Sequence, residues 1–317
     1  MVASRTYLFT PANNEKRVNK VLHLAGMPGY REAQEGAGTV SLNADAVILD
    51  LEDAVALSEK AQAREMARNA LRLPRPVKTS LVYVRINSTG SGLWREDLES
   101  VVTDGLDGIM LPKSESAADV RQVDELLFEL ERARGMPEGR IQLIPLVESA
   151  RGVWNAFEIA SGCKRVTCLA FGAIDFTLDI GTSYSKGGTE LLYARSRLVV
   201  ASRAAGVLPP VDTVFPDIRD TEGLIAETKA VKQLGFFGKL VIHPDQIEPV
   251  NRIFAPTTAE VEQARRIVDA FARAEAEGIA AIQVDGQMVD YPVAARARRI
   301  LALAGTLEET DDKGGQE

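Results

Sequence analysis

Residues 45–71 read DAVILDLEDAVALSEKAQAREMARNAL and contain one complete strand-to-helix unit. The run Ala46–Leu51 is short and largely apolar, as a strand covered on both faces of a parallel sheet should be. The segment EKAQAREMARNAL that follows repeats its apolar residues with the 3.6-residue period of an amphipathic helix. Such alternation of strand and helix predicts an α/β protein with a parallel sheet rather than a sandwich of antiparallel sheets.

The same unit recurs along the chain. Apolar runs alternate with helical patterns, as in AADVRQVDELLFELERARG after the fourth run. Eight parallel strands are the number that closes a TIM barrel, so the sequence predicts a (β/α)8 barrel. The predicted strands are Thr6–Phe9, Ala46–Leu51, Leu81–Ile86, Gly108–Leu111, Ile141–Val147, Val166–Phe171, Asp212–Phe215 and Lys239–Ile242.

The chain continues past the eighth predicted strand. Its 317 residues exceed the length of a simple barrel, which is roughly 200 to 250 residues. We therefore predict a catalytic barrel over residues 1–255 and a C-terminal helical extension over residues 256–317. Within the extension, the sequence predicts a helix from near Thr258 to Gly278, a hairpin turn at Asp285 and Gly286, and a helix with Pro292 in its first turn.

Composition excludes several classes of protein. The formal net charge of −8, with no basic stripe, argues against a nucleic-acid partner. No apolar stretch approaches the length of a membrane span, so we expect a cytoplasmic protein. Cys163 and Cys168 lie in or beside an apolar run and are expected to be buried rather than to bind metal. No GxSxG, P-loop, HExxH or Rossmann glycine motif occurs.

Charged and polar side chains directly follow most of the predicted strands. In a TIM barrel, the carboxyl ends of the strands and the loops after them form the active site. A structural ion pair or a helix cap would explain any one of these residues. Several carboxylates and an arginine converging on one rim favour a functional site. The strand-end residues are Thr10, Glu52, Asp53, Arg85, Asn87, Lys113, Glu148, Asp175, Asp217 and His243.

Oxygen donors dominate this rim, and the whole chain contains two histidines. Such donors favour a hard cation such as Mg²⁺ over zinc, because Mg²⁺ takes one or two carboxylates plus water and substrate oxygens. Lys113 leaves a second chemistry open, since a strand-end lysine can form a Schiff base with a carbonyl substrate. We favour a pairing role for Lys113, because nearby carboxylates should raise its pKa rather than lower it.

Ordered motifs along nearly the whole chain resemble one known family. They are SRTYLFTPANNEKR, LDLEDAV, VRIN, LPKSES, PLVESARG, FGAIDF, IHPDQI and DGQMVDYPV. In this order they resemble the citrate lyase β-subunit-like group, or HpcH/HpaI aldolase family, which includes malyl-CoA and citramalyl-CoA lyases. The segment Gly26–Ala44 departs from the family, because it is longer than the usual first connection.

The resemblance implies roles for individual residues on the rim. Glu148 and Asp175 look like the two carboxylates that bind Mg²⁺. Arg85 looks like the residue that holds the oxyanion and carboxylate of the substrate. Glu52 and Asp53 look like supporting acids that orient metal-bound water and pair with Arg85 or Lys113.

Other implied roles concern the coenzyme and the C-terminal extension. Phe9, Arg17 and Lys60 are similar in placement to residues that line a coenzyme A channel. Asp290 looks like the acid/base carboxylate, which a lid formed by the extension delivers to a neighbouring subunit. From the residues alone, a turn carboxylate beside Tyr291 is the preferred reading of Asp290. The lid implies a homotrimer or a dimer of trimers.

The resemblance implies a carbon–carbon lyase of the oxo-acid-lyase type. Its substrate would be a 3-hydroxyacyl-CoA thioester such as citramalyl-CoA or malyl-CoA, and its products acetyl-CoA and a 2-ketoacid. Two alternatives stay open. One is the citryl-carrier lyase subunit of a citrate lyase complex, and the other is a metal-dependent aldolase or thioesterase of the same superfamily.

Overall fold

The computed structural model describes residues 4–24, 44–73 and 80–312. The chain forms two compact units, which divide between Asn251 and Arg252. The division falls inside helix α10 (Ile247–Phe254). The predicted insertion Gly26–Ala44 lies outside the described residues except for its last residue. Within the described ranges, no helix is long and apolar enough to cross a membrane.

Seven parallel strands form the sheet of the first unit, in the order β6-β5-β4-β3-β2-β1-β7. Single parallel bridges join Ala170 to Val211 and Asp212 to Lys239, so residues 211 and 212 connect the two ends of the sheet. The sheet is therefore closed, and the predicted TIM barrel is confirmed. The strands are β1 (Thr6–Pro11), β2 (Ala46–Asp50), β3 (Leu81–Arg85), β4 (Gly108–Leu111), β5 (Gln142–Val147), β6 (Ala170–Phe171) and β7 (Lys239–Val241).

The predicted strand Asp212–Phe215 is wrong. At this position the chain makes only the two bridges at Val211 and Asp212. Pro209 and Pro210 come immediately before, and proline has no N–H to donate to a strand ladder. The barrel position between β6 and β7 is thus filled by Val211 and Asp212, with a single bridge to each neighbouring strand.

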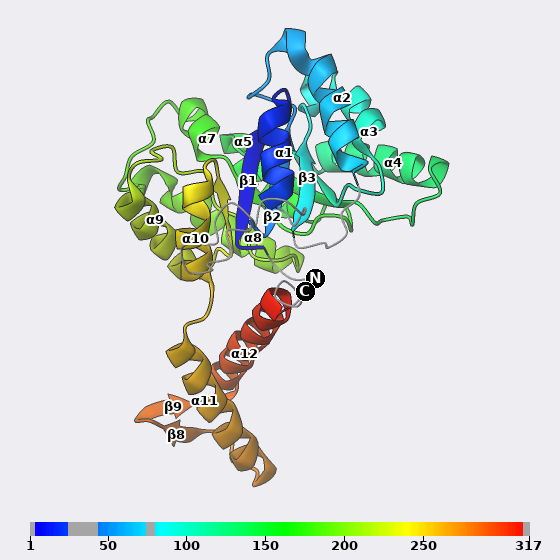
Figure 1. Ribbon diagram of the computed structural model, residues 1–317. Coiled ribbons are helices and arrows are strands. Elements are labelled where there is room, and N and C mark those ends of the chain that lie inside the picture. Colours follow the sequence, from blue (N-terminus) through cyan, green and yellow to red (C-terminus); the bar gives the residue numbers. More distant parts are fainter. Residues whose placement is uncertain (1–3, 25–43, 74–79, 313–317) are drawn as a thin grey trace, which may run out of the picture. The chain divides into compact units, whose positions relative to one another are not determined.

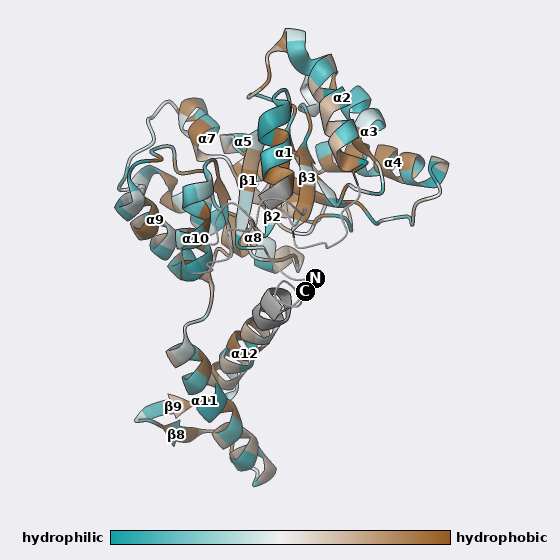
Figure 2. Ribbon diagram, in the orientation of Figure 1, coloured by the Kyte–Doolittle hydropathy of each residue, from teal (hydrophilic) through white to brown (hydrophobic). Residues whose placement is uncertain are grey.

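Helices follow the strands and surround the barrel (Figure 1). The predicted helices after the second and fourth strands are confirmed as α2 (Lys60–Leu71) and α4 (Ala117–Ala133). Figure 2 shows bands of hydrophilic and hydrophobic colour along α2, as expected for a helix with one buried face. The other helices of this unit are α1 (Glu15–Leu24), α3 (Trp94–Val101), α5 (Ala150–Trp154), α6 (Ala156–Ala160), α7 (Ala173–Asp179), α8 (Leu192–Ala205) and α9 (Thr221–Leu234), with single 3-10 turns at Leu57–Glu59, Thr89–Ser91, Thr189–Leu191 and Pro244–Gln246.

Alternate strand residues fill the barrel interior. Successive side chains of a strand point to opposite faces, so every second residue points inward. The interior cluster includes Tyr7 and Tyr83, whose ring centroids lie 5.9 Å apart. Cys168 belongs to this cluster and is buried as predicted, whereas Cys163 is half-buried. The remaining members are Ala46, Ile48, Met110, Ile144, Leu146, Ala170, Val211 and Leu240.

The second unit contains two helices and a hairpin. Helix α11 (Thr258–Ala276) begins with a capping box in which Thr257 and Glu260 bond each other's backbone N–H groups. The hairpin of β8 (Ile282–Val284) and β9 (Gln287–Val289) turns at Asp285 and Gly286, both with positive φ, as predicted. Helix α12 (Tyr291–Asp312) follows and packs its first half on α11 around Phe271.

A buried ion network lies where the barrel has only the two bridges. The ammonium of Lys239 is fully buried and lies 2.7 Å from Asp212 Oδ2 and 2.6 Å from Glu227 Oε1. Arg195 Nε donates to Asp212 Oδ1 over 2.8 Å. The network joins the bridge residue Asp212 to α8 and α9, so side-chain contacts hold the closure that a strand ladder would otherwise provide.

Replacing Lys239 tests this closure. Lys239→Met should leave the carboxylates of Asp212 and Glu227 undercompensated and lower the free energy of unfolding by about 3–5 kcal/mol. The control is Lys229→Met, on the exposed face of the helix that carries Glu227. This variant should change the free energy of unfolding by less than about 0.5 kcal/mol. Urea unfolding measures both variants, and equal stability of the two would contradict the proposed role of the network.

Candidate functional site

The inward-facing positions at the carboxyl ends of three strands are charged. On β2, β3 and β5, the interior residues Ile48, Tyr83 and Leu146 each precede a charged residue by two positions. Because side chains alternate between faces, these charged residues continue the interior face of the barrel at its rim. They are Asp50, Arg85 and Glu148.

Arg85 is held by carboxylates on and beside the neighbouring strand. Asp50 and Arg85 are direct partners in the parallel register of β2 and β3. Arg85 donates from Nε to Asp50 Oδ1 over 2.7 Å and from Nη2 to Asp50 Oδ2 over 2.6 Å. Its Nη1 lies 3.2 Å from Glu52 Oε2. This two-pronged contact fixes the plane of the guanidinium, and donors remain on Arg85 for another ligand.

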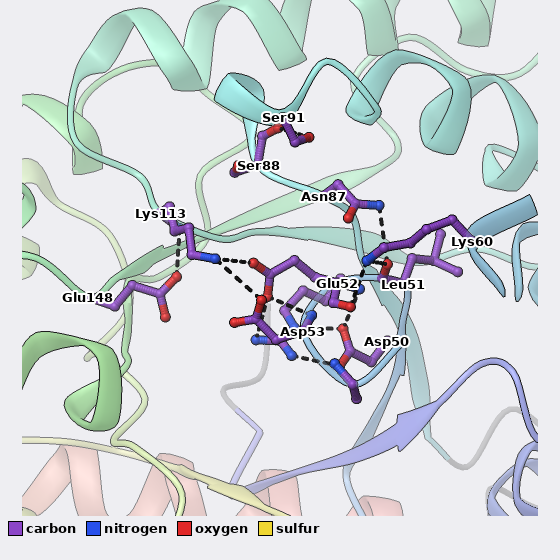
Figure 3. Close-up of polar contacts among 12 residues, drawn as sticks. Asp50, Leu51, Glu52, Asp53, Lys60, Asn87, Ser88, Ser91, Lys113 and Glu148 are labelled. Carbon is purple, nitrogen blue, oxygen red and sulfur yellow. Dashed lines mark hydrogen bonds and ion pairs between the residues drawn. The ribbon is translucent and has the colours of Figure 1, made fainter. Parts of the chain in front are cut away.

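Phe9 and Lys60 border the same group of residues. The guanidinium carbon of Arg85 lies 4.8 Å from the centre of the Phe9 ring, in a cation–π contact. Lys60 is buried, and its ammonium donates to the backbone oxygens of Leu51 and Glu52 over 2.6 and 2.7 Å (Figure 3). Lys60 therefore fixes the turn that carries Glu52, and its contact with a coenzyme stays a prediction.

Lys113 joins the two sides of the rim (Figure 3). Its ammonium lies 2.5 Å from Glu52 Oε1 and 3.4 Å from Asp53 Oδ1. Its backbone N–H donates to Glu148 Oε1 over 2.7 Å. Lys113 has a φ of 51°, in the left-handed region that is costly for a residue with a Cβ. The backbone conformation that directs this N–H is therefore strained.

Glu148 also lies against the backbone of the next strand end. A Cβ added at Gly172 would lie 2.5 Å from Glu148 Oε2 and 2.7 Å from Glu148 Cβ. Any larger residue at position 172 would therefore displace the carboxylate. Gly172 leads directly into α7, whose first turn carries Asp175. The close approach at Gly172 lets Glu148 lie near Asp175.

Burial and charge perturb the acids of this site. Burial raises the pKa of Glu148 to about 8, and the nearby Asp175 carboxylate contributes further to the rise. Burial also raises the pKa of Glu52, although Arg85 and Lys113 oppose it. For Lys113, burial alone would lower the pKa, but the hydrogen bond and charge of Glu52 raise it above its ordinary value. A raised pKa keeps Lys113 protonated, which disfavours a Schiff base.

The structure brings most of the predicted site residues together. Glu52, Asp53, Arg85 and Glu148 share one network through Lys113 and Asp50, and Asp175 lies close enough to Glu148 to raise its pKa. Two other predicted site residues, Arg17 and Asp290, lie outside this network. Arg17 is exposed on α1. Asp290 belongs to the second unit, where its Oδ1 accepts from the N–H of Val293 at the start of α12.

Three features of the site were missed by the sequence reasoning. Asp50 is the main partner of Arg85, and its signal was a charged residue at an inward position of the apolar run AVILDL. Gly172 permits the placement of Glu148, and its signal was a glycine at the end of a strand in FGAID. The positive φ of Lys113 had no clear signal, because Pro112 and Lys113 do not by themselves define that conformation.

Comparison with known proteins identifies the family. The family model described as HpcH/HpaI aldolase/citrate lyase matches residues 36–244, and that described as C-C bond lyase of the TIM-barrel fold matches residues 197–306. The citrate lyase subunit beta of Leuconostoc mesenteroides subsp. cremoris is 39% identical over 310 residues, which cover 98% of this chain and 96% of the relative. The chain belongs to the HpcH/HpaI aldolase/citrate lyase family.

Two further relatives extend the range of activities in this family. The mitochondrial citramalyl-CoA lyase of Homo sapiens is 32% identical over 324 residues, covering 97% of this chain and 87% of the relative. The crystal structure of CitE from Mycobacterium tuberculosis, in complex with magnesium, acetoacetate and coenzyme A, is 33% identical with a TM-score of 0.71. The match covers 96% of this chain and 98% of the CitE chain. The chain is thus a carbon–carbon lyase of the HpcH/HpaI family, as predicted.

The raised pKa of Glu148 has a measurable consequence for stability without metal. A carboxyl whose folded-state pKa is raised from 4.5 to about 8 stabilises the fold most below pH 4.5 and loses this stability as pH rises through about 8. Glu148→Gln cannot ionise, and its amide oxygen can still accept from Lys113 N–H. We expect Glu148→Gln and wild type to be equally stable at about pH 4.5, and the variant to be more stable above about pH 8.

Urea unfolding in the presence of a chelator, repeated across this pH range, makes the measurement. Glu129→Gln on the exposed face of α4 is the control and should show no pH-dependent difference from wild type. A difference between Glu148→Gln and wild type that stays constant with pH would contradict the raised pKa.

Proposed function

We propose that this chain is a Mg²⁺-dependent lyase that cleaves a 3-hydroxyacyl-CoA thioester, of the citramalyl-CoA or malyl-CoA type, into acetyl-CoA and a 2-ketoacid. One observation carries the proposal. The buried carboxylate of Glu148 and the fixed guanidinium of Arg85 face the same rim of the barrel, with Asp175 beside Glu148. An acidic pair and an arginine together can hold a cation and an oxyanion.

The residues of this chain fit a magnesium ion. Glu148 and Asp175 supply carboxylate oxygens, which Mg²⁺ prefers, and the close approach at Gly172 leaves room for Glu148 in this position. Among the described residues, no group of three or more His, Cys, Asp or Glu side chains could hold a metal by itself. Mg²⁺ suits two carboxylates, because it keeps several water or substrate oxygens. When bound, it would act as a Lewis acid for the hydroxyl and carboxylate oxygens of the substrate.

Arg85 can stabilise the enolate that forms when the substrate is cleaved. When the C2–C3 bond of the thioester breaks, the C3 hydroxyl passes its proton to water at the site and becomes the carbonyl group of the 2-oxoacid. The electron pair of the broken bond passes to the thioester as an enolate. A guanidinium fixed by Asp50 can meet the developing oxyanion without moving, so little reorganisation opposes the reaction.

Glu52, Asp53 and Lys113 support this arrangement indirectly. Glu52 contacts both Arg85 and Lys113, so it links the oxyanion side to the metal side of the rim. Asp53 is exposed and close to the same ammonium, in a position to orient water at the site. We assign these three residues to positioning. Their substitution should weaken binding and turnover less than substitution of Glu148 or Arg85.

Coenzyme A would approach along the side of the rim formed by β1 and α1. Phe9 and Arg17 come from these elements, and Lys60 supports the adjoining turn. The CitE structure from Mycobacterium tuberculosis contains coenzyme A, magnesium and acetoacetate together, which supports a family site able to hold all three. We propose Phe9 and Arg17 as the contacts that reach the coenzyme, with Lys60 beside them.

Asp290 would be the residue that protonates the enolate carbon. In the second unit its carboxylate caps α12 through the N–H of Val293, over 3.2 Å. A cap residue at a hairpin-to-helix junction can present its second oxygen to a ligand. We propose that the second unit acts as a lid on the barrel of a neighbouring copy in a cytoplasmic homotrimer or dimer of trimers, and that Asp290 reaches the substrate there.

A second candidate function rests on sequence identity. The citrate lyase β subunits of Leuconostoc mesenteroides and Escherichia coli are 39% and 41% identical to this chain, above the 32% of the citramalyl-CoA lyase of Homo sapiens. The chain would then act within a citrate lyase complex on a citryl thioester carried by a partner. Cleavage of free coenzyme A thioesters by the isolated chain supports the first function, and cleavage only of a carrier-bound thioester supports the second.

Removing either metal carboxylate tests the proposed activity. Purified protein with Mg²⁺ should release a 2-ketoacid from citramalyl-CoA or malyl-CoA. Glu148→Ala and Asp175→Ala should weaken metal binding by more than about a hundredfold, since even supporting residues around a metal account for about 10- to 100-fold. Titration with Mn²⁺ followed by electron paramagnetic resonance measures the affinity independently of turnover.

The matched control is Glu129→Ala, which removes an exposed carboxylate on α4 and should leave both affinity and turnover unchanged. Full activity in excess chelator would overturn the metal assignment, and unchanged Mn²⁺ affinity in both alanine variants would overturn the choice of ligands.

Asp290→Asn separates the chemical role of Asp290 from its role as a helix cap. Asparagine caps a helix about as well as aspartate, so α12 should remain stable. Loss of the ionisable group should lower turnover by about 10²- to 10⁴-fold, the usual contribution of a general acid or base. Mn²⁺ affinity should stay at the wild-type value. Unchanged turnover would mean that Asp290 only caps helix α12 and takes no part in the reaction.

A further inference from the structure

A cavity of about 820 Å³ lies at the opposite end of the barrel from the candidate site. Its walls come from the end of α2, the connection from α3 to β4 and the connection from α4 to β5. These connections precede their strands, so they lie at the amino ends of the strands. Glu52, Arg85 and Glu148 lie at the carboxyl ends. In TIM barrels the reaction takes place at the carboxyl ends, so this cavity is separate from it.

The cavity is positively charged in an acidic protein. Four arginines and two acids line it, which leaves two formal positive charges, whereas the chain as a whole carries −8. Burial lowers the pKa of Arg134, and Arg72 lowers it further against the opposing effect of Glu99. Arg72 and Arg134 thus lie close enough to repel each other. The charged lining residues are Arg68, Arg72, Arg134, Arg140, Glu99 and Asp104.

Backbone oxygens hold two of the arginines in place. Arg134 donates from Nη1 to the carbonyl oxygen of Val102, and from Nη2 to that of Glu99 over 2.5 Å. Arg140 donates from Nη2 to the carbonyl oxygen of Asp104 over 2.5 Å. Carbonyl oxygens carry no formal charge, so these bonds orient the guanidinium groups without neutralising them. The cavity therefore keeps preorganised positive charge.

Three buried polar atoms of the cavity residues have no hydrogen-bond partner in the described part of the protein. They are Arg68 Nε, Arg140 Nη1 and Thr103 Oγ1. Leaving a buried donor without a partner costs about 1–3 kcal/mol. Two of these atoms are guanidinium nitrogens, which can only donate. These atoms are closed to solvent, so they do not face the cavity directly. Rotation of the Arg68 and Arg140 side chains toward an anion with acceptor oxygens would relieve the cost of the two unpaired guanidinium nitrogens.

We propose that this arginine cavity binds a small oxyanion with two or more negative charges, a polycarboxylate or a phosphate compound. The volume lies within the range of small-molecule sites, which is about 300–1,000 Å³. Guanidinium groups match carboxylate and phosphate oxygens in two-pronged geometry. A single negative charge would leave part of the positive charge of the four arginines uncompensated, so multivalent anions should bind more tightly than monovalent ones.

Isothermal titration of the metal-free full-length protein tests the cavity. The probes are citrate, inorganic pyrophosphate and acetate at constant ionic strength. We expect saturable binding of citrate or pyrophosphate, and at least about tenfold weaker binding of acetate. The comparison of citrate with pyrophosphate tells which oxyanion chemistry the cavity prefers, and saturable binding of either supports the proposal.

Variants locate the bound anion. The double variant Arg68→Gln with Arg140→Gln should weaken binding at least about tenfold. Arg72→Glu changes an exposed side chain, so it gives a second test that does not depend on buried contacts. It should weaken binding to a similar extent. Arg121→Gln replaces an exposed arginine at the other end of α4 and is the matched control.

Glu148→Gln separates this site from the proposed active site. Anion binding should be the same in Glu148→Gln, Arg121→Gln and wild type. The proposal is overturned if neither citrate nor pyrophosphate binds saturably. It is also overturned if binding persists undiminished in the double variant and in Arg72→Glu, or if binding is lost in Glu148→Gln, because the anion would then occupy the carboxyl-end rim.

Discussion

The paired contact between Arg85 and Asp50 is the interaction on which the rim of the barrel depends. The two residues are register partners on adjacent parallel strands, and the carboxylate is almost fully buried. A buried charge of either sign alone would be costly, so each residue requires the other. With its plane fixed, the guanidinium also contacts Glu52 and the ring of Phe9. The strand register thereby sets the positions of side chains that come from three separate segments.

Backbone geometry on the other side of the rim controls Glu148. One oxygen accepts the N–H of Lys113, which requires a left-handed conformation at a residue with a Cβ. The other lies where only a glycine at position 172 leaves room. Strain at a functional position persists when surrounding contacts over-determine it. Here the ammonium of Lys113 supplies such a contact through Glu52, so the two sides of the rim constrain each other.

Charge is distributed differently at the two ends of the barrel and at its closure. The carboxyl-end rim carries acids whose ionisation is opposed by burial, while the cavity at the amino ends gathers arginines held by backbone oxygens. At the closure, Lys239 and Asp212 are fully buried and paired. We propose an added ion or ligand for the first two sets, whereas the charges of the third are paired within the protein. Burial alone therefore does not distinguish a ligand site from a structural network.

The sequence by itself determined the alternation of strands and helices, the hairpin at Asp285 and the polar strand ends, because these follow from local periodicity and turn chemistry. The family motifs added roles to those strand ends. Only the tertiary structure decided that Asp50 pairs with Arg85, that the predicted strand Asp212–Phe215 is reduced to two bridges, and that arginines from two segments line one cavity. The strand register, the closure of the barrel and the cavity depend on contacts between residues far apart in the chain. Local sequence patterns do not predict which of these distant residues come into contact.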